Sequence, residues 1–441
     1  MNKYQTIAST LSQLIDEGRY RDRLPTIRSL MTMFRASQST INQALQLLIQ
    51  ANKIYNKPHS GYFIIPNHVE KMESHSVYDF STASTSWTDF PMAHYVHCLE
   101  IAFKNEKEDL FTYGDVTGQT SLKQSFQSLL ADQHIFAKTD QIVITSGTQQ
   151  ALHLLALMMK TNHDKILIEQ PTYHQMVNLI ERLDLNYATY GRHLEAFDMD
   201  AFEKVVQRTQ LDYVYLMPRL HNPLGTTISE ADKIKLIRLA HQYHFYMIED
   251  DYLGDFEHHN AYKALYELDD QQCVIYLKSF SKIMFPGQRL GFAVLPEKLS
   301  EPFIKMKEIA DIQTNTLSQL MMQTFIQSGL YDTHKNNVIS KHRQKVKILQ
   351  QALKRYFHHY QYNDNNKLHT VIKLPKRINM TGLYRDFEKL GIGVDDYRKN
   401  YMPGFPDRDK FLKLNTTRIA EDQIDPGLRL IRQAIRHNQI F

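Results

Sequence analysis

From about residue 110 onward, the sequence alternates short, almost continuously apolar runs with longer segments of helical periodicity. Gln149–Met159 and Glu230–His241 are two of these helical segments. This alternation predicts an α/β fold in which a buried, mostly parallel sheet is covered by helices on both faces. Because such sheets bind ligands at the carboxyl ends of their strands, the residues after each strand are the first candidates for a site. The runs predicted to form strands are Ile142–Thr145, Lys165–Glu169, Tyr213–Met217, Tyr246–Glu249, Val274–Leu277 and Gly291–Val294.

Five of these strand ends carry chemically useful side chains. The first is followed by small residues and a helix, where free N–H groups and the helix dipole favour an anion. The next three supply an aromatic ring, an amide, and a carboxylate beside a phenol, and the fifth supplies a Ser/Lys/Arg cluster. Taken singly, each feature has an ordinary explanation, such as a capped helix or a core tyrosine, but their order and spacing together predict a ligand site. The residues are Gly147, Thr148, Gln149, Tyr173, Asn222, Asp250, Asp251, Tyr252, Ser279, Ser281, Lys282 and Arg289.

The first 66 residues differ in charge from the rest of the chain. They contain eight Lys and Arg against three Asp and Glu, whereas the whole chain has a net charge of +4. The positive excess is therefore confined to this segment, as expected of a small module that binds the phosphate backbone of nucleic acid. On charge alone, a random surface imbalance explains the excess equally well.

The same segment has the residue pattern of a winged helix-turn-helix domain. Apolar residues at helical spacing, separated by capping residues, predict three helices. Two short strands, Lys53–Tyr55 and Gly61–Ile65, predict a hairpin wing whose tip carries Lys57 and His59. In such domains the recognition helix enters the major groove by its N-terminal end. The side chains expected there, able to hydrogen-bond base edges or phosphates, are Gln38, Ser39, Thr40, Asn42 and Gln43.

Three motifs in this segment resemble the winged helix-turn-helix head of GntR-type regulators. They are Leu24-Pro25-Thr26-x-Arg28-x-Leu30, Ser37-x-Ser39-Thr40-Ile41 and Ser60-Gly61-Tyr62-Phe63-Ile64. The resemblance implies that Arg28, Ser39 and Thr40 contact DNA. One departure is that Asp22-Arg23 stands where the family usually has a glycine before the Leu-Pro pair. The alternative, a small three-helix interaction module, is less favoured by charge and motifs together.

The strand-end residues resemble those of the fold-type I pyridoxal phosphate (PLP) enzymes, the aspartate aminotransferase-like group, over residues ~80 to 441. The resemblance implies that Lys282 forms the internal aldimine and that Asp250, or Asp251 if the register differs by one, pairs with the pyridinium nitrogen. It further implies that Asn222 and Tyr252 bond the ring O3′ and that Tyr173 stacks on the ring. The implied phosphate site consists of Gly147, Thr148, Gln149, Ser279, Ser281, Arg289 and, across a dimer interface, Tyr113.

The substrate end departs from this family pattern. The family usually has an arginine near the C-terminus that binds the substrate α-carboxylate through two hydrogen bonds. Lys413 occupies the matching place, and a lysine cannot reproduce the planar fork of a guanidinium. Arg418 is nearby but out of register. The residues therefore favour cofactor binding over amino-acid binding.

The organisation predicted from the sequence is a head, residues 1–66, a Ser/Thr-rich linker, residues 67–88, and a body, residues 89–441. A GntR-type head on an aminotransferase-like body resembles the MocR-type regulators. The resemblance implies a homodimer that binds double-stranded promoter DNA and holds PLP as its cofactor. The effector is expected to be PLP itself or an amine or amino acid that forms an external aldimine. The alternative is an active PLP-dependent aminotransferase with an appended DNA-binding head.

Composition adds two expectations about where such a chain works. It has only two cysteines, Cys98 and Cys273, so a disulfide framework is not expected and the cytoplasm is the predicted location. Since no apolar run approaches the ~18–20 residues that span a bilayer, no membrane partner is expected. No metal site is expected either.

Overall fold

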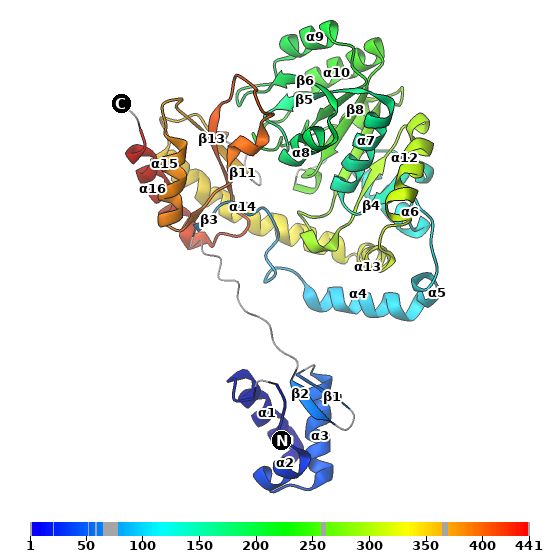
Figure 1. The fold of residues 1–441 in the computed structure, drawn as a ribbon, viewed down its shortest axis with the longest axis vertical. Helices are drawn as coiled ribbons and strands as arrows, with labels where there is room; N and C mark the ends of the chain where they lie inside the picture. The colour runs from blue at the N-terminus through cyan, green and yellow to red at the C-terminus, as the bar shows by residue number, and fades with distance from the viewer. Residues whose placement is uncertain are drawn as a thin grey trace. The chain divides into compact units, whose positions relative to one another are not determined.

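The chain folds into two compact units, residues 1–75 and residues 76–441, whose elements are labelled in Figure 1. The computed structural model describes residues 2–20, 22–51, 53–57, 60–64, 78–256, 262–363 and 369–439. Within these ranges, no helix has the length and apolar character needed to cross a membrane.

The N-terminal unit is a winged helix-turn-helix domain, as predicted. Its core is formed by apolar residues from all three helices, including the fully buried Leu11, Leu30 and Ile41. Thr26 and Ser37 act as helix caps, accepting hydrogen bonds from the backbone N–H groups of Ser29 and Thr40. The elements are α1 (Lys3–Asp16), α2 (Ile27–Phe34), α3 (Gln38–Gln50) and an antiparallel hairpin of β1 (Ile54–Lys57) and β2 (Gly61–Ile64).

The second unit is built on a mixed sheet that has seven strands among the described residues, in the order β4-β10-β9-β8-β7-β5-β6. Only β10 runs antiparallel to its neighbours, because it returns from β9 through a short connection. The sequence analysis missed β6, whose polar residues form a half-exposed edge strand paired only with β5. The strands are β4 (Ile142–Thr145), β5 (Lys165–Gln170), β6 (Asn186–Gly191), β7 (Tyr213–Leu216), β8 (Tyr246–Asp251), β9 (Val274–Ser279) and β10 (Gly291–Val294).

Helices cover both faces of this sheet, as the continuous apolar strands predict. On one face pack α7 (Thr148–Asn162), α8 (His174–Leu183) and α12 (Glu297–Asp311). On the other pack α9 (Met199–Arg208), α10 (Glu230–Tyr243) and α11 (Leu265–Leu268). Beside β4, α6 (Thr120–Ala131) packs on the strand and α13 (Thr316–Gln327) packs on α6, while α4 (Met92–Asn105) and α5 (Lys107–Leu110) pack on α13.

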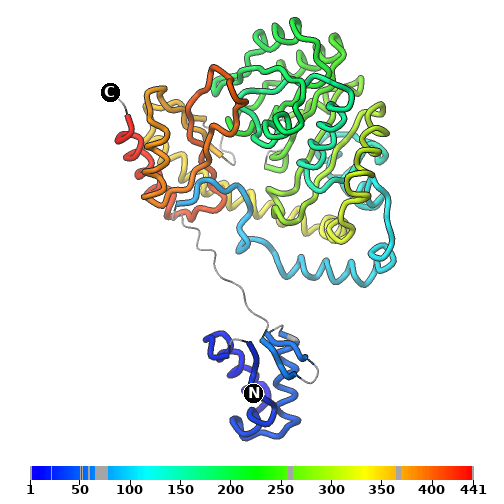
Figure 2. Tube along the Cα trace, in the orientation of Figure 1, coloured from blue at the N-terminus to red at the C-terminus, as the bar shows by residue number. Residues whose placement is uncertain are grey.

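The C-terminal part forms a second layer with its own apolar core, reached through the long α14 (Leu330–Tyr356). Figure 2 shows the chain after β3 running from this layer toward α4. Of the predicted linker, residues 67–77 lie outside the described ranges. Residues 78–88 belong to the second unit, because β3 pairs with β12 and Phe80 is fully buried. The elements of the layer are β3 (Tyr78–Asp79), β11 (His369–Leu374), α15 (Met380–Lys389), β12 (Ile392–Gly393), β13 (Lys410–Asn415) and α16 (Glu421–His437).

Candidate functional site

A cavity of about 230 Å³ lies at the carboxyl ends of the parallel strands, where ligands of such sheets bind. We call it the strand-end cavity. Its wall contains every residue predicted to hold the cofactor except Tyr113, together with Met217 and Pro286. The lining residues are Gly147, Thr148, Gln149, Tyr173, Met217, Asn222, Asp250, Tyr252, Ser279, Ser281, Lys282, Pro286 and Arg289.

One end of the cavity is suited to an anion. Gly147 precedes α7 with φ of 81°, a conformation that favours glycine, and the start of a helix presents unpaired N–H groups. The Arg289 side chain lies beside it: a Cβ on Gly147 would be only 3.2 Å from Arg289 Nη2. Arg289 is held by a 2.8 Å hydrogen bond from Nη2 to the carbonyl oxygen of Ser146. A helix start and a guanidinium thus converge on one point.

Asp250 provides a buried carboxylate on the cavity wall. Its Oδ2 accepts a 2.7 Å hydrogen bond from the Tyr215 hydroxyl, whereas Oδ1 is buried and has no hydrogen-bond partner among the described residues. Burial raises the pKa of Asp250 to about 7. A buried oxygen without a donor is costly, so this geometry suits a ligand that brings an N–H group.

Asp251, the alternative to Asp250, is used elsewhere. Burial acts to raise its pKa, but the Arg219 guanidinium, with which it forms a buried ion pair, keeps the pKa below its usual value. Its carboxylate also accepts a 2.7 Å hydrogen bond from the Tyr276 hydroxyl. Of the two carboxylates, Asp250 lines the cavity and Asp251 does not, so only Asp250 is placed to meet a ligand there.

The Lys282 side chain is half-buried at the cavity wall. Burial lowers its pKa, which favours the neutral amine that acts as a nucleophile. Its Nζ donates a 2.6 Å hydrogen bond to the carbonyl oxygen of Ala83. The lysine is therefore held at the cavity wall by the segment that precedes α4.

Two further polar residues of the wall, Tyr252 and Asn222, have protein partners. The Tyr252 hydroxyl donates to the carbonyl oxygen of Leu220 at 2.9 Å. Asn222 Oδ1 accepts a 2.6 Å hydrogen bond from Lys413 Nζ, which leaves its amide N–H groups for a ligand. Burial raises the pKa of Tyr173 to about 12, so this ring is a neutral phenol at physiological pH.

Lys413 lies on β13 and contacts the cavity through Asn222 rather than as part of its described lining. Burial lowers the pKa of Lys413 to about 7, so a large fraction of this side chain is uncharged at neutral pH. An uncharged amine attracts a carboxylate weakly. The structure thus adds a second reason, besides the missing guanidinium fork, to expect weak binding of an α-carboxylate at this end.

Tyr113 lies outside the cavity of its own chain and is 85% exposed. Its neighbour Phe111 is 90% exposed. Large aromatic side chains with this exposure commonly mark a surface that another molecule covers.

The predicted DNA-contacting side chains form the open surface of the N-terminal unit. Six are exposed, in α2, in α3 and at the end of β1: Arg28, Gln38, Ser39, Asn42, Gln43 and Lys57. Thr40 is only half exposed, and its hydroxyl shares a 2.8 Å hydrogen bond with the Ser37 hydroxyl. His59, predicted at the wing tip, lies outside the described residues.

Comparison with known proteins relates both units to families. Residues 3–64 match the bacterial regulatory proteins of the gntR family, and residues 90–371 match aminotransferase class I and II. The uncharacterized HTH-type transcriptional regulator YcxD of Bacillus subtilis is 36% identical over 441 residues, covering 98% of this chain and 99% of its own. The probable rhizopine catabolism regulatory protein MocR of Rhizobium meliloti is 22% identical, covering 73% and 66%.

The chain belongs to the MocR-type transcriptional regulators. Its head is a GntR-type DNA-binding domain, and its body has the aminotransferase class I and II fold, which typically binds PLP. The same body fold is found in the α-aminoadipate aminotransferase LysN of Thermus thermophilus, solved in complex with N-(5′-phosphopyridoxyl)-L-leucine. That structure superposes with a TM-score of 0.74 at 22% identity, covering 82% of the regulator and 92% of LysN.

Sequence analysis missed a segment of the regulator that contacts the site. We call residues 80–86 the anchor segment. Besides the bond from Lys282 to Ala83, the Thr85 hydroxyl lies 3.1 Å from the carbonyl oxygens of both Lys282 and Ile283. The polar, Ser/Thr-rich composition of this segment predicts a linker. The one signal in the sequence for such a contact is the hydroxyl of Thr85, because Ser and Thr hydroxyls can hydrogen-bond backbone groups.

The anchor segment is also hydrogen-bonded to the last residue of β13 and to residues that follow this strand. Asn415 Nδ2 donates to the carbonyl oxygen of Ser81 at 2.8 Å, and the Thr417 hydroxyl donates to that of Thr82 at 2.7 Å. Arg418 Nε donates to the Ser84 hydroxyl at 3.1 Å, which gives a structural role to the arginine that is out of register. The segment therefore connects the Lys282 loop with the strand that carries Lys413.

Proposed function

We propose that this MocR-type protein is a PLP-responsive regulator of transcription, whose head binds promoter DNA and whose body holds PLP covalently through Lys282. The strand-end cavity carries the proposal. It brings an anion-binding helix start, a buried carboxylate oxygen that lacks a donor, and a half-buried lysine into about 230 Å³. PLP has the three matching groups: a phosphate, a ring nitrogen and an aldehyde.

The lining residues other than Met217 and Pro286 then have defined roles. When bound, PLP supplies an aldehyde that condenses with a lysine amine and a ring that withdraws electrons. Asp250 accepts the ring N–H, Asn222 and Tyr252 bond the ring oxygen, and Tyr173 stacks on the ring face. The phosphate is held by Gly147, Thr148, Gln149, Ser279, Ser281 and Arg289.

The anchor segment supports a route from the cofactor to the DNA-binding head. It directly follows β3, near the start of the body in the sequence, and it accepts a hydrogen bond from Lys282 Nζ. An amine that is covalently attached to PLP has fewer N–H groups to donate, so attachment weakens this bond. A ligand shifts a conformational equilibrium only through such differential contacts.

We propose PLP itself as the effector rather than an amino acid. The reason is Lys413, which is half-buried, bonded to Asn222 and only partly charged at neutral pH. A chain that grips the substrate carboxylate weakly is poorly suited to transamination, even when it binds the cofactor well.

We further propose that the regulator works as a homodimer, because proteins with the aminotransferase fold are commonly dimers. The exposed Tyr113 and Phe111 support this proposal, since a partner subunit would bury them. In that arrangement Tyr113 reaches the phosphate end of the partner subunit's cavity.

Visible absorption tests the attachment of the cofactor. Purified protein with PLP should show a band in the visible or near-ultraviolet range that borohydride reduces and fixes to the chain. Lys282→Ala should lose the fixed cofactor, while Lys305→Ala, which changes an exposed lysine paired with Glu301, should keep it. Fixation that persists in Lys282→Ala would show that another lysine carries PLP.

A further inference from the structure

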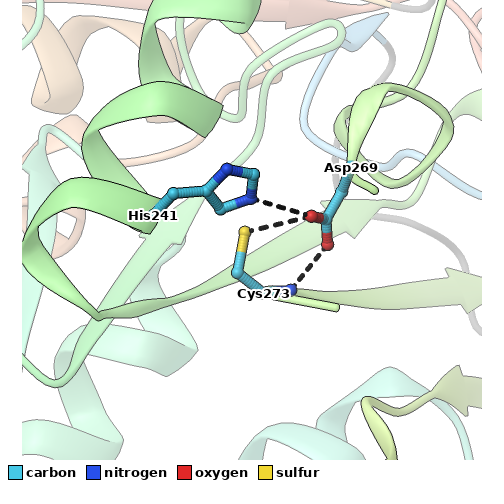
Figure 3. A group of neighbouring side chains, drawn as sticks. All are labelled: His241, Asp269 and Cys273. Carbon is cyan, nitrogen blue, oxygen red and sulfur yellow. Dashed lines mark hydrogen bonds and ion pairs between the residues drawn. The ribbon is translucent and has the colours of Figure 1, made fainter. Parts of the chain in front are cut away.

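A second cluster of chemically active side chains lies outside the strand-end cavity. It consists of His241 in the last turn of α10, Asp269 directly after α11 and Cys273 directly before β9. Figure 3 shows the three side chains pointing toward one another from these separate elements. Their possible ligand atoms, a ring nitrogen, a carboxylate oxygen and Sγ, all lie within 4.8 Å of one another.

The distances within this cluster are close to those around a zinc ion. His241 Nε2 lies 3.1 Å and Cys273 Sγ lies 3.4 Å from Asp269 Oδ1. Zinc binds nitrogen and oxygen at about 2.0–2.2 Å and thiolate sulfur at about 2.3 Å, so neighbouring ligands of a tetrahedron stand about 3.3–3.6 Å apart. The two distances to Asp269 are already close to this spacing, and the His241 and Cys273 ligand atoms, which lie within 4.8 Å of each other, need to approach by at most about 1 Å to complete three corners of a tetrahedral site.

The carboxylate of the cluster is fixed before any ion arrives. Asp269 accepts hydrogen bonds from the backbone N–H groups of Gln271 at 3.0 Å, Cys273 at 2.6 Å and Val274 at 2.9 Å. Its side chain is 3% exposed, and Cys273 is also buried. Ligands that are already held in place lose little conformational entropy on binding an ion.

An ion can reach the cluster from solvent. A cavity of about 470 Å³ borders it, and His241, His244 and Cys273 all contribute to its wall. The cavity supplies both an entrance and room for a water molecule as the fourth ligand. Three protein ligands with an open fourth position is an arrangement that zinc accepts.

We propose that His241, Asp269 and Cys273 form a zinc-binding site. Zn²⁺ replaces the thiol proton of Cys273, which is released to solvent, while Asp269 binds as its carboxylate and His241 as the neutral ring. The ion, one thiolate and one carboxylate then sum to zero charge, which suits a largely buried site. Asp269 and Cys273 lie in the short loop between α11 and β9, whereas His241 comes from α10, so the sequence shows no short ligand motif that would indicate the site.

The zinc site is independent of the proposed cofactor. Cys273 directly precedes β9, and the strand-end cavity begins at the opposite end of that strand, at Ser279. The six residues of β9, at about 3.3 Å each, separate the two sites by about 20 Å. Loss of zinc should therefore leave PLP bound, so the two proposals can fail separately.

Metal binding by the full-length chain tests the proposal, and Cys98 provides a matched control because it is the other cysteine of the chain. The protein is stripped with a chelator, and binding of Zn²⁺ and Co²⁺ is measured by titration and by metal analysis after desalting. We expect the unaltered chain and Cys98→Ser to bind one Zn²⁺ tightly. Cys273→Ser and His241→Gln should each weaken binding at least about tenfold, since even loss of outer contacts to a metal site costs that much.

Cobalt shows whether the sulfur is a ligand, because Co²⁺ bound to a thiolate gives an intense near-ultraviolet charge-transfer band. The band should appear in Cys98→Ser and be absent in Cys273→Ser. Circular dichroism and the PLP band show whether each variant is folded, and if Cys273→Ser does not fold, His241→Gln decides. Unchanged zinc affinity in the folded variants, or bound cobalt without the sulfur band, would overturn the proposal.

Discussion

At the scale of single residues, burial sets the charge of the side chains that define the cavity. It raises the pKa of Asp250 to about 7 and lowers the pKa of Lys413 to about 7, so both groups change charge near physiological pH. A ligand N–H stabilises the charged form of Asp250, whereas a carboxylate stabilises the charged form of Lys413. The charge of Asp250 therefore responds to a ligand that donates an N–H group, and the charge of Lys413 responds to a ligand that carries a carboxylate.

Replacing Asp250 by Asn should stabilise the cofactor-free protein at high pH. The folded-state pKa of Asp250 lies near 7 against an ordinary value of 3.8, so between these values the folded state holds a proton that the unfolded state has lost. Stability contributed by this group is present at low pH and is lost as pH rises toward 7. Asp250→Asn has no carboxylate to ionise, so it avoids this loss of stability. Its free energy of unfolding should exceed that of the unaltered chain by up to about 4 kcal/mol at pH ~8 and differ little near pH ~4.

Urea unfolding of the cofactor-free body at several pH values measures this effect. Asp251→Asn is the matched control: it breaks the buried ion pair with Arg219 and should destabilise the protein at every pH above ~4. If Asp250→Asn is less stable than the unaltered chain at pH ~8, Asp250 is not a buried carboxylate that lacks a hydrogen-bond donor.

Replacing Lys413 by Arg should increase the response to amino acids. An arginine stays charged at all relevant pH values and offers two parallel N–H groups to a carboxylate. At pH ~8 the unaltered, PLP-loaded protein should show little change in absorption on adding a panel of L-amino acids, while Lys413→Arg should respond. Lowering the pH to ~6 should narrow the difference, because Lys413 then regains its charge.

Lys410→Arg is the control for this experiment, since Lys410 lies on the same strand and its Nζ donates to the carbonyl oxygens of Lys376 and Ile378. An unaltered protein that responds at pH ~8 as strongly as Lys413→Arg would mean that Lys413 does not limit amino-acid binding.

At the scale of elements, the anchor segment is the part of the body best placed to register the state of Lys282. Thr85→Ala removes the hydroxyl that contacts the carbonyl oxygens of Lys282 and Ile283 and leaves the cavity wall intact. The variant should bind PLP normally but show a smaller change in DNA affinity on adding PLP. Ser86→Ala is the control, because the Ser86 hydroxyl bonds only the exposed Thr88 hydroxyl in the described structure.

Absorption gives PLP binding, and fluorescence anisotropy gives DNA affinity with and without PLP. If the DNA affinity of Thr85→Ala responds to PLP as strongly as that of the Ser86→Ala control, the anchor segment does not link PLP binding to DNA binding.

The sequence predicted elements well where burial alone dictates them. β4 and β10 have the predicted bounds, because apolar runs of four residues between turn signals leave few alternatives. β6 was missed because an edge strand with polar, half-exposed residues has no such run. The anchor segment was taken for linker because its bonds run to residues about 200 or more positions away, which local composition does not indicate.

For the candidate site, the sequence indicated which residues belong to it, but not which carboxylate faces the cavity or how Lys413 is charged. Residues following the strands were identified because the order of strand ends is visible in the chain. The choice between Asp250 and Asp251 depends on which neighbour pairs with Arg219, and the charge of Lys413 depends on burial by distant segments. Contacts of both kinds arise only in the folded chain.

At the scale of the whole molecule, positive charge and the GntR-type fold belong to one unit, and the strand-end cavity belongs to the other. DNA binding and cofactor binding are therefore separable by substitution. Arg28→Ala should weaken binding to promoter DNA both with and without PLP while leaving the PLP band unchanged, since Arg28 is an exposed side chain of the head.

The central claim is that PLP attached at Lys282 alters DNA binding. The most direct test is the affinity of the full-length protein for a promoter fragment selected by the protein itself, at fixed salt, with and without PLP, in the unaltered chain and in Lys282→Ala. The account predicts at least a severalfold change on adding PLP to the unaltered chain and none in Lys282→Ala. Equal affinity with and without PLP in the unaltered chain, or a full response in Lys282→Ala, would contradict it.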